Sequence, residues 1–154
     1  ISEFGDYDLI ISKINRSGDE LWTQTLDING GDDAAVDIAL DANNNIFLVG
    51  SSYDSETDLA ELLVVHYDNS GNLQWSENYS APNSVYNVGT SITTDGTNLY
   101  IGGTTFNMQY QSDFLALSYS ASNGNLNWDY SWDNIGLNDI VTSIYRNGSK
   151  LYLA

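Results

Sequence analysis

Residues 8–22 read DLIISKINRSGDELW, and the pattern returns as ELLVVHYDNSGNLQW at 61–75 and as DFLALSYSASNGNLNW at 113–128. Each copy begins with an acidic residue, continues through an apolar run and ends in a Gly-x-x-x-Trp unit. The three tryptophans of these units follow one another at intervals of 53 residues. Three aligned copies at one fixed interval predict a structural repeat. The copies span residues 8–60, 61–112 and 113–154, the last of them truncated.

The second half of each repeat aligns as well. DAAVDIALDANNNIFLVG begins at Asp33, NVGTSITTDGTNLYIGG at Asn87 and DIVTSIYRNGSKLYLA at Asp139. In the first repeat we expect strands at 9–15, 21–26, 34–40 and 46–51. These runs are rich in β-branched and aromatic residues, Asp-Gly and Asn-Gly occupy the later turns, and no segment has helical periodicity. Four strands per repeat of 52–53 residues predict an all-β chain of four-stranded antiparallel units.

The quoted segments resemble the bacterial seven-bladed β-propeller repeat family, and the Gly-x-x-x-Trp unit is similar to the tryptophan-docking motif of pyrroloquinoline-quinone (PQQ) dehydrogenase propellers. The resemblance covers nearly all 154 residues. It implies an open arc of blades, because three repeats are too few for a ring of four to eight blades. It also implies that each Trp ring is buried in an equivalent position between blades. The docking residues are Gly18, Trp22, Gly71, Trp75, Gly124 and Trp128.

The docking motif further implies how the strands are divided among blades. Residues 34–40 would be an innermost strand and residues 73–79 the outermost strand of the same blade, with half-blades before and after two whole ones. The sequence opens with Ile1 and stops at Ala154 inside an apolar run, so we expect a fragment of a longer propeller. The remaining blades of the parent chain would then be its partners. The family also implies a secreted or cell-surface protein of bacterial origin.

The composition argues against several classes of function. The 154 residues include 21 acidic and 4 basic side chains, and the net charge of −17 disfavours nucleic acid and anionic membrane surfaces as partners. No apolar run approaches the roughly 20 residues of a membrane-spanning helix. The chain contains no cysteine, which excludes disulfides and thiolate chemistry. The single histidine, His66, has no phased nucleophile beside it, so no catalytic residue is assigned.

The connections between the expected strands fall into two classes. Tight turns are uniform, whereas longer links differ in length and composition, and a meander places the two classes at opposite ends. We expect ligand binding at the end with the longer links, called the long-link face, which comprises residues 27–33, 52–60, 81–87, 105–112 and 133–139. Its expected binding residues are Asp27, Asp32, Asp33, Tyr53, Asp54, Asn87, Tyr110, Asp133 and Asp139.

Two features of this face have competing interpretations. Asp33, Asn87 and Asp139 recur in every repeat, which favours hydrogen bonds that fix a loop over contacts to a ligand. The Gly-rich link 27–33 is a candidate calcium site, because three carboxylates and an amide supply the oxygen ligands that this ion prefers. Its ligands would be Asp27, Asn29, Asp32 and Asp33. A solvated acidic loop without metal is the simpler alternative.

Three hypotheses about function follow. The favoured one is a non-catalytic propeller scaffold that binds a protein or glycan ligand through the long-link face. Carboxylates on solvated loops are poorly held for acid–base catalysis, which argues against an enzyme. The alternatives are part of a PQQ-dependent dehydrogenase, implied by the docking motif alone, and a glycan-binding or glycan-processing propeller.

Overall fold

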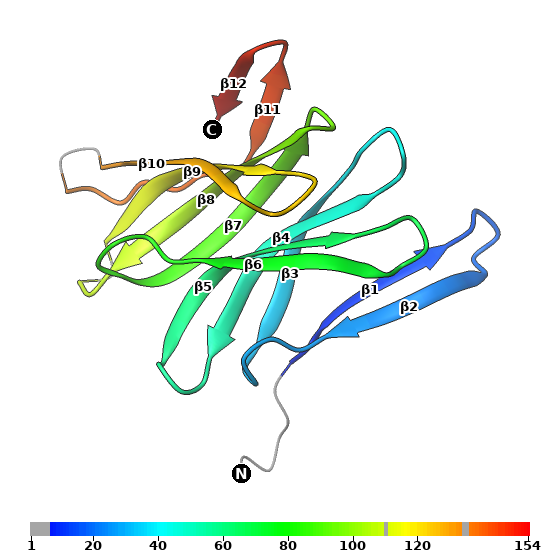
Figure 1. The fold of residues 1–154 in the computed structure, drawn as a ribbon. Helices are drawn as coiled ribbons and strands as arrows, with labels where there is room; N and C mark the ends of the chain where they lie inside the picture. Colours follow the sequence, from blue (N-terminus) through cyan, green and yellow to red (C-terminus); the bar gives the residue numbers. More distant parts are fainter. Residues whose placement is uncertain (1–6, 110, 134–135) are drawn as a thin grey trace.

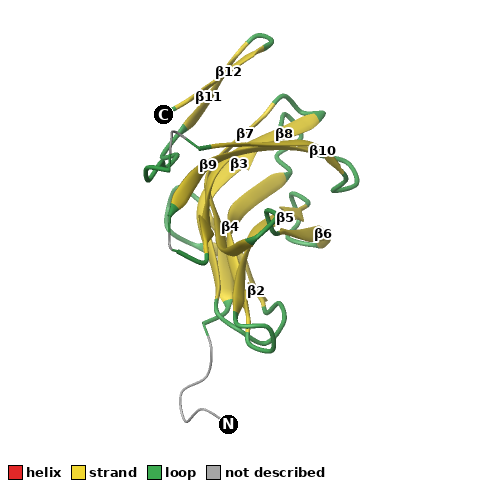
Figure 2. Ribbon diagram, turned by 90° about the vertical axis from the view of Figure 1, so that its left-hand side faces the viewer, coloured by secondary structure: helices red, strands yellow, loops and turns green. Residues whose placement is uncertain are grey.

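The computed structural model describes residues 7–109, 111–133 and 136–154. These residues form strands and connections without a helix (Figure 2), so the all-β prediction is confirmed. The strands are β1 (Leu9–Ile14), β2 (Glu20–Leu26), β3 (Asp33–Leu40), β4 (Ile46–Asp54), β5 (Leu59–Tyr67), β6 (Leu73–Tyr79), β7 (Ser84–Thr94), β8 (Asn98–Asn107), β9 (Ser112–Ser120), β10 (Leu126–Trp132), β11 (Ile144–Asn147) and β12 (Lys150–Leu153).

The strands form two consecutive four-stranded meanders with a hairpin at each end (Figure 1). The first meander is β3-β4-β5-β6 and the second is β7-β8-β9-β10, and all neighbouring strands within them are antiparallel. The β1–β2 hairpin precedes them and the β11–β12 hairpin follows. A parallel bridge between Ala60 in β5 and Tyr86 in β7 joins the two meanders.

Several strands extend further into the long-link face than the sequence predicted. The β4–β5 ladder continues to the pair Asp54 and Leu59, which leaves a tight turn in place of the expected link 52–60. Likewise, β8 continues through Asn107. Each added ladder position pairs backbone N–H and C=O groups that a loop would leave to water. The predicted residue Asn87 accordingly lies within β7.

Figure 1 also shows the two classes of connection at opposite ends. The β3–β4, β5–β6 and β7–β8 turns lie on the right and upper side, and the β4–β5, β6–β7 and β8–β9 links on the left and lower side. This separation follows from the antiparallel connectivity, since alternate connections return to the same end.

The tight turns are closed by an Asx side chain at their start. Asp41 Oδ1 accepts hydrogen bonds from the backbone N–H groups of Asn43 (2.8 Å) and Asn45 (2.9 Å), and Asp68 does the same in the β5–β6 turn. Partial burial opposes ionisation of Asp41, but the bonds from Asn45 and Asn43 outweigh it and lower the pKa of that carboxyl. The side-chain and backbone amides of Asn72 lower the pKa of Asp68. These turns are therefore held by local contacts.

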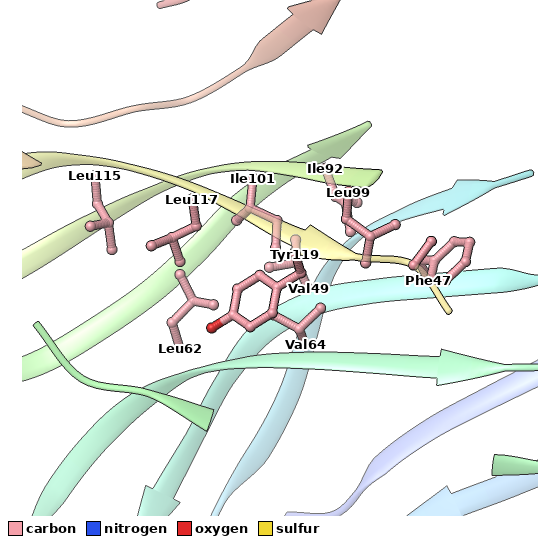
Figure 3. Packing of buried hydrophobic residues seen from close by; sticks show 11 residues of the cluster. Phe47, Val49, Leu62, Val64, Ile92, Leu99, Ile101, Leu115, Leu117 and Tyr119 are labelled. Atoms are coloured by element: carbon pink, nitrogen blue, oxygen red, sulfur yellow. The ribbon is translucent and has the colours of Figure 1, made fainter. Parts of the chain in front are cut away.

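Both faces of the central strands β4 and β5 are buried, which explains why these strands read as continuous apolar runs. In β4, Phe47 and Val49 face the second meander, whereas Ile46 and Leu48 face the β1–β2 hairpin, because successive side chains alternate. Figure 3 shows the cluster between the two meanders, with Phe47, Val49, Leu62, Val64, Ile92, Leu99, Ile101, Leu115, Leu117 and Tyr119.

The Gly-x-x-x-Trp unit packs one repeat against the next. The Trp22 ring lies over Gly71, where an added Cβ atom would come within 2.8 Å of ring atom Cδ2. The Trp75 ring lies over Gly124 in the same way, with a distance of 3.0 Å. Both glycines also have left-handed φ angles, +85° and +70°. Glycine therefore suits both the backbone conformation and the ring contact.

The expectation of three equivalent buried rings is not met, because Trp22 and Trp75 are half-buried and Trp128 is exposed. Its side chain is 39% exposed, and no described glycine lies beneath its ring. Gly18, at the other end of the series, has no atom within 4 Å of an added Cβ. The physical reason is that the contact needs a glycine from a following repeat, which Trp22 and Trp75 have and Trp128 lacks among the described residues.

Candidate binding face

An Asp or Asn residue recurs at the end of the longer links, and its side chain forms hydrogen bonds that hold the link against the sheet. Asp33 Oδ2 accepts a 2.5 Å hydrogen bond from the backbone N–H of Ile28 and so closes its own link. Asn87 Oδ1 accepts one from the N–H of Ala81 (3.2 Å), and its Nδ2 donates to the carbonyl of Ala60 in β5 (3.2 Å). These contacts agree with the loop-fixing interpretation.

The backbone at this position also contacts the residue that directly precedes the acidic start of the same repeat. The N–H of Asp33 donates to the carbonyl of Tyr7 (2.6 Å), and the N–H of Asp139 donates to the carbonyl of Ser112 (2.8 Å). Two of the predicted binding residues are therefore committed, through their main chains, to junctions between a hairpin and the adjacent meander.

The Asp33 carboxylate lies in a poorly solvated corner of the long-link face. The residue is 3% exposed, and this burial is the main cause that raises its pKa above the ordinary value. Ser52 and the N–H of Ile28 oppose the shift, whereas the charges of Asp27 and Asp8 add to it. Asp33 Oδ1 and Ser52 Oγ are both buried without a hydrogen bond of regular geometry. Three carboxylates thus share this corner.

The positions aligned with the three carboxylates of this corner are acidic again in the third repeat. They are Asp113, Asp133 and Asp139. Burial is the main cause that raises the pKa of Asp113, and the charges of Asp133 and Asp139 raise it further. The first and third repeats therefore each have an acidic corner on the long-link face, formed respectively by Asp8, Asp27 and Asp33 and by Asp113, Asp133 and Asp139.

The second repeat is different because its three positions hold Glu61, Ser80 and Asn87. Glu61 Oε1 accepts a hydrogen bond from Ser80 Oγ (2.8 Å), and Oε2 accepts one from Asn78 Nδ2 (2.9 Å). The Glu61 charge is thus satisfied within its own meander, while the aligned carboxylates of the other repeats repel one another. A self-contained corner therefore separates the two acidic ones.

A cavity of about 310 Å³ opens beside the acidic corner of the third repeat. Hydroxyl and amide groups predominate among its polar lining groups, and Asp113 contributes the carboxylate. Such a lining suits a ligand with hydroxyl or cationic groups. The lining residues are Ala81, Pro82, Asn83, Ser84, Thr105, Asn107, Asp113 and Ser131.

The carboxylates of the link 27–33 point to separate backbone amides. Asp27 Oδ1 accepts from the N–H of Gly30 (3.2 Å), and Asp32 Oδ1 accepts from the N–H of Tyr7 (2.9 Å). Within the described ranges, no group of three or more His, Cys, Asp or Glu side chains is placed to hold a metal ion. Calcium binding at 27–33, with Asn29 as the fourth ligand, stays a prediction that requires these bonds to be exchanged for metal contacts.

Tyr53 and Asp54, at the end of β4, contact neighbouring connections. The Tyr53 hydroxyl donates to the Asp58 carboxylate, which is the main cause that raises the pKa of Tyr53. The N–H of Tyr53 donates to the carbonyl of Asp32 (2.9 Å). Asp54 accepts from the N–H of Glu56 (2.8 Å), which lowers the pKa of Asp54. These bonds order the turn that the two residues begin.

Aromatic rings add an apolar surface to the same face. Tyr86 and Phe106 form an edge-to-face pair with centroids 5.5 Å apart, and Tyr86 is 41% exposed. Tyr110, which the sequence also assigned to this face, lies outside the described residues.

The sequence-based assignment missed Asp113 and Ser131 as cavity residues. A usable signal was present in the aligned repeats, where Glu61 is replaced by Asp113 and Asn78 by Ser131. The first repeat has Asp8 and Thr25 at these positions, so the hydrogen-bonded pair of the second repeat is absent from the other two. Comparing repeats position by position would have marked this as a site where they diverge.

No protein-family model and no characterised protein matches this chain in sequence. The part of the chain that the structure describes forms no helix with the length and apolarity needed to cross a bilayer.

Proposed function

We propose that this chain is a β-propeller segment that serves as a non-catalytic scaffold and binds a ligand through its long-link face. The propeller assignment is supported by four-stranded meanders in series and by the Trp22 and Trp75 rings that pack on glycines of the next repeat. A secreted or cell-surface location belongs to the same proposal and rests on the resemblance to the bacterial repeat family.

The observation that carries the binding role is the contrast between Glu61 and Asp113. Uniform tight turns and repeated junctions account for the frame, whereas the long-link face changes its chemistry from repeat to repeat. Glu61 is satisfied by Asn78 and Ser80, but Asp113 lines an open cavity near two other carboxylates. A ligand that brings positive charge to this cavity relieves the repulsion among them.

A protein ligand with exposed lysine or arginine side chains is the best match, because the chain carries a net charge of −17. A glycan is the second candidate. The hydroxyl and amide lining of the cavity and the exposed Tyr86 favour it, since sugars bind through hydrogen bonds and ring stacking. The quinone-dehydrogenase alternative rests on the docking motif alone.

The test compares Asp113→Asn with Glu61→Gln, two changes that remove one negative charge from the same face. Binding of a lysine-rich peptide and of a panel of oligosaccharides is measured by calorimetry. We expect peptide binding that Asp113→Asn weakens about tenfold, close to 1.4 kcal/mol, and that Glu61→Gln leaves nearly unchanged. Equal weakening by both variants would indicate charge attraction without a site. Turnover of a sugar or alcohol by the chain would contradict the non-catalytic proposal.

A further inference from the structure

Lys13 and His66 are aligned residues of the first two repeats. Lys13 lies opposite the docking residue Trp22 in the β1–β2 ladder. His66 lies opposite Trp75 in the β5–β6 ladder. Each of the two tryptophans packs on a glycine of the following repeat. The two side chains therefore occupy equivalent places, Lys13 where the β1–β2 hairpin meets the first meander and His66 where the two meanders meet.

The Lys13 ammonium forms hydrogen bonds across its junction to one turn residue. Its Nζ donates to the Asn69 carbonyl (3.0 Å) and also to the Asn69 side-chain oxygen Oδ1. Asn69 lies two residues before Gly71, the glycine beneath the Trp22 ring. The carbonyl and the side-chain oxygen of a turn in the following repeat thus hold a primary ammonium group beside the contact between Trp and Gly.

A cavity of about 340 Å³ lies at the corresponding place where the two meanders meet. His66 lines it, and so does Ser122, which lies two residues before Gly124 and is therefore the counterpart of Asn69. Because an imidazole is shorter than a lysine side chain, the space that the Lys13 ammonium fills one repeat earlier is open here. The cavity lies at the end that bears the β3–β4 and β7–β8 turns (Figure 1), away from the long-link face. Its other lining residues are Asp41, Asn43, Asn45, Phe47, Gly96, Thr97 and Ala121.

His66 brings an unsatisfied imidazole to the wall of this cavity. The residue is 8% exposed, and neither Nδ1 nor Nε2 has a hydrogen-bond partner. Burial lowers the pKa of His66 against the opposing charges of Asp41 and Asp68, so the ring is neutral at neutral pH. A neutral imidazole has one acceptor nitrogen and does not repel a cation. A buried polar group without a partner costs free energy, which a bound donor recovers.

Asp41 gives the cavity a negative charge and an open acceptor site. Its Oδ1 accepts the N–H groups of Asn43 and Asn45, and its Oδ2 accepts Asn45 Nδ2 (2.9 Å). A carboxylate has roughly four acceptor sites, so one is still open on Oδ2. Despite partial burial, the bonds from Asn45 and Asn43 lower the pKa of Asp41 and keep it ionised at neutral pH. The hydroxyl groups of Thr97 and Ser122 add acceptors from the second meander.

We propose that this cavity binds a primary ammonium group, supplied by a small amine or by a lysine side chain of a partner protein, where the Lys13 ammonium lies one repeat earlier. Asp41 Oδ2 and the oxygens of Ser122 accept two of its N–H groups, and the His66 ring turns its acceptor nitrogen to the third. Three donors then meet three acceptors, one of them charged. The site is separate from the ligand cavity at Asp113, because the two lie at opposite ends of the strands.

Titration of the wild-type chain with ethylammonium, followed by NMR, tests the site directly. His66 is the single histidine, so its ring gives one unambiguous signal, and the amides of Gly96 and Thr97 report from the second meander. We expect all three signals to move along one saturation curve. Tetramethylammonium is the control, because it carries the same charge without N–H donors. Equal shifts with both cations, or a His66 signal that does not move, would overturn the proposal.

Two variants test the assigned groups, with the Gly96 amide as the common signal and circular dichroism as the check on folding. His66→Lys supplies the ammonium from the chain itself, and Asp41→Asn removes the charge but keeps an oxygen for the turn. We expect each to weaken ethylammonium binding at least about tenfold, as the loss of a charged hydrogen bond does. Ser70→Lys is the matched control, because it adds a positive charge to an exposed turn outside the cavity. Unchanged affinity in His66→Lys and Asp41→Asn would contradict the site.

The same titration with Nα-acetyl-lysine methylamide distinguishes the two sources of the ammonium group. Shifts as large as those with ethylammonium would identify a lysine side chain as a ligand that the cavity accepts. Shifts with ethylammonium alone would restrict the site to small amines. Asp113→Asn should leave both titrations unchanged, because Asp113 lies on the long-link face. The outcome is therefore independent of the ligand proposed for that face.

Discussion

The molecule has two junctions that can be compared. The hairpin junction lies between β1–β2 and the first meander, and the meander junction lies between the two meanders. Both have a Trp ring packed on a Gly, but their polar contacts differ. At the hairpin junction, Lys13 Nζ donates to the Asn69 carbonyl (3.0 Å), and Trp22 Nε1 is buried without a partner. At the meander junction, Trp75 Nε1 donates to the Ala121 carbonyl (3.2 Å). The side chain that donates the hydrogen bond across the junction is therefore Lys13 in the first case and Trp75 in the second.

His66 takes the place of Lys13 at the meander junction. Its ring stacks on Phe47 with centroids 4.5 Å apart and meets Trp75 edge-on at 5.5 Å. The residue is 8% exposed, and both ring nitrogens are buried without a hydrogen bond. The comparison teaches that the Trp-on-Gly contact is the constant part of a junction, while the residues around it can exchange a charged link for an aromatic stack.

Trp75→Ala is expected to have the largest effect. It removes a ring that packs against the cluster between the meanders and a hydrogen bond to Ala121, so we expect the free energy of unfolding to fall by about 3–5 kcal/mol. Urea unfolding followed by fluorescence and circular dichroism measures this change. Trp22→Ala should cost less, because it also removes a buried N–H group that lacks a partner. Equal losses would show that the polar difference between the junctions has no energetic weight.

Gly124→Ala separates the ring contact from the backbone conformation. A left-handed residue other than glycine costs about 1–2 kcal/mol, and displacement of the Trp75 ring should add about 1–3 kcal/mol. Gly96→Ala is the control, because Gly96 also has a positive φ but nothing lies within 4 Å of an added Cβ. Thermal melts of the two variants should differ clearly. Identical destabilisation would argue that the ring contact over Gly124 contributes nothing.

Phenylalanine at the two tryptophan positions sharpens the comparison. Trp75→Phe leaves the Ala121 carbonyl without its donor, whereas Trp22→Phe deletes an N–H group that is already unpartnered. The unfolding free energies of the two variants should therefore differ by about 1–3 kcal/mol, with Trp75→Phe the less stable. Denaturant midpoints at equal slope provide the measurement. The reverse order would be incompatible with the hydrogen-bond assignment.

The smallest expected effect is a dependence of folding stability on pH, and it arises at the meander junction alone. Burial lowers the pKa of His66, although Asp41 and Asp68 oppose this shift. The folded chain then binds a proton less readily than the unfolded chain, so stability falls as the pH drops below the ordinary value of 6.5. Melting temperatures between pH 5.5 and 7.5 should show this slope in the wild type, and His66→Phe should reduce it. A slope unchanged by His66→Phe would exclude His66 as its source.

Much of the fold was predictable because the repeat itself carries the information. Alternation in residues 34–40, the apolar run at 46–49 and the Asp-Gly turn at Gly96 each specify local structure, and alignment of three copies reinforces the pattern. The separation of tight turns and longer links followed from antiparallel connectivity alone.

The candidate site was less predictable, because it depends on which partners each aligned residue finds in its own repeat. Asp33 was expected to fix its loop, with calcium binding as an alternative, and its carboxylate closes a link through Ile28. Asp113 looked like one member of a repeated acidic position, yet it lacks the amide and hydroxyl partners that Glu61 has. The exposure of Trp128 likewise depends on a glycine that must come from another repeat. The contrast between Glu61 and Asp113 and the exposure of Trp128 cannot be derived from a single repeat in isolation.

The Asx-closed turns have a consequence for the order of folding. A hairpin whose turn is fixed by Asp41 or Asp68 can close through local contacts, and hairpin closure takes about 1–10 μs. The Trp75 ring, in contrast, must meet a glycine of the next repeat, so its contact forms after two such units exist. The rate-limiting event is then the first successful docking of neighbouring units, and later repeats add to that nucleus. Substitutions in the turns and at Trp75 should therefore both slow refolding, because the turns form before this event and the Trp75 contact forms in it.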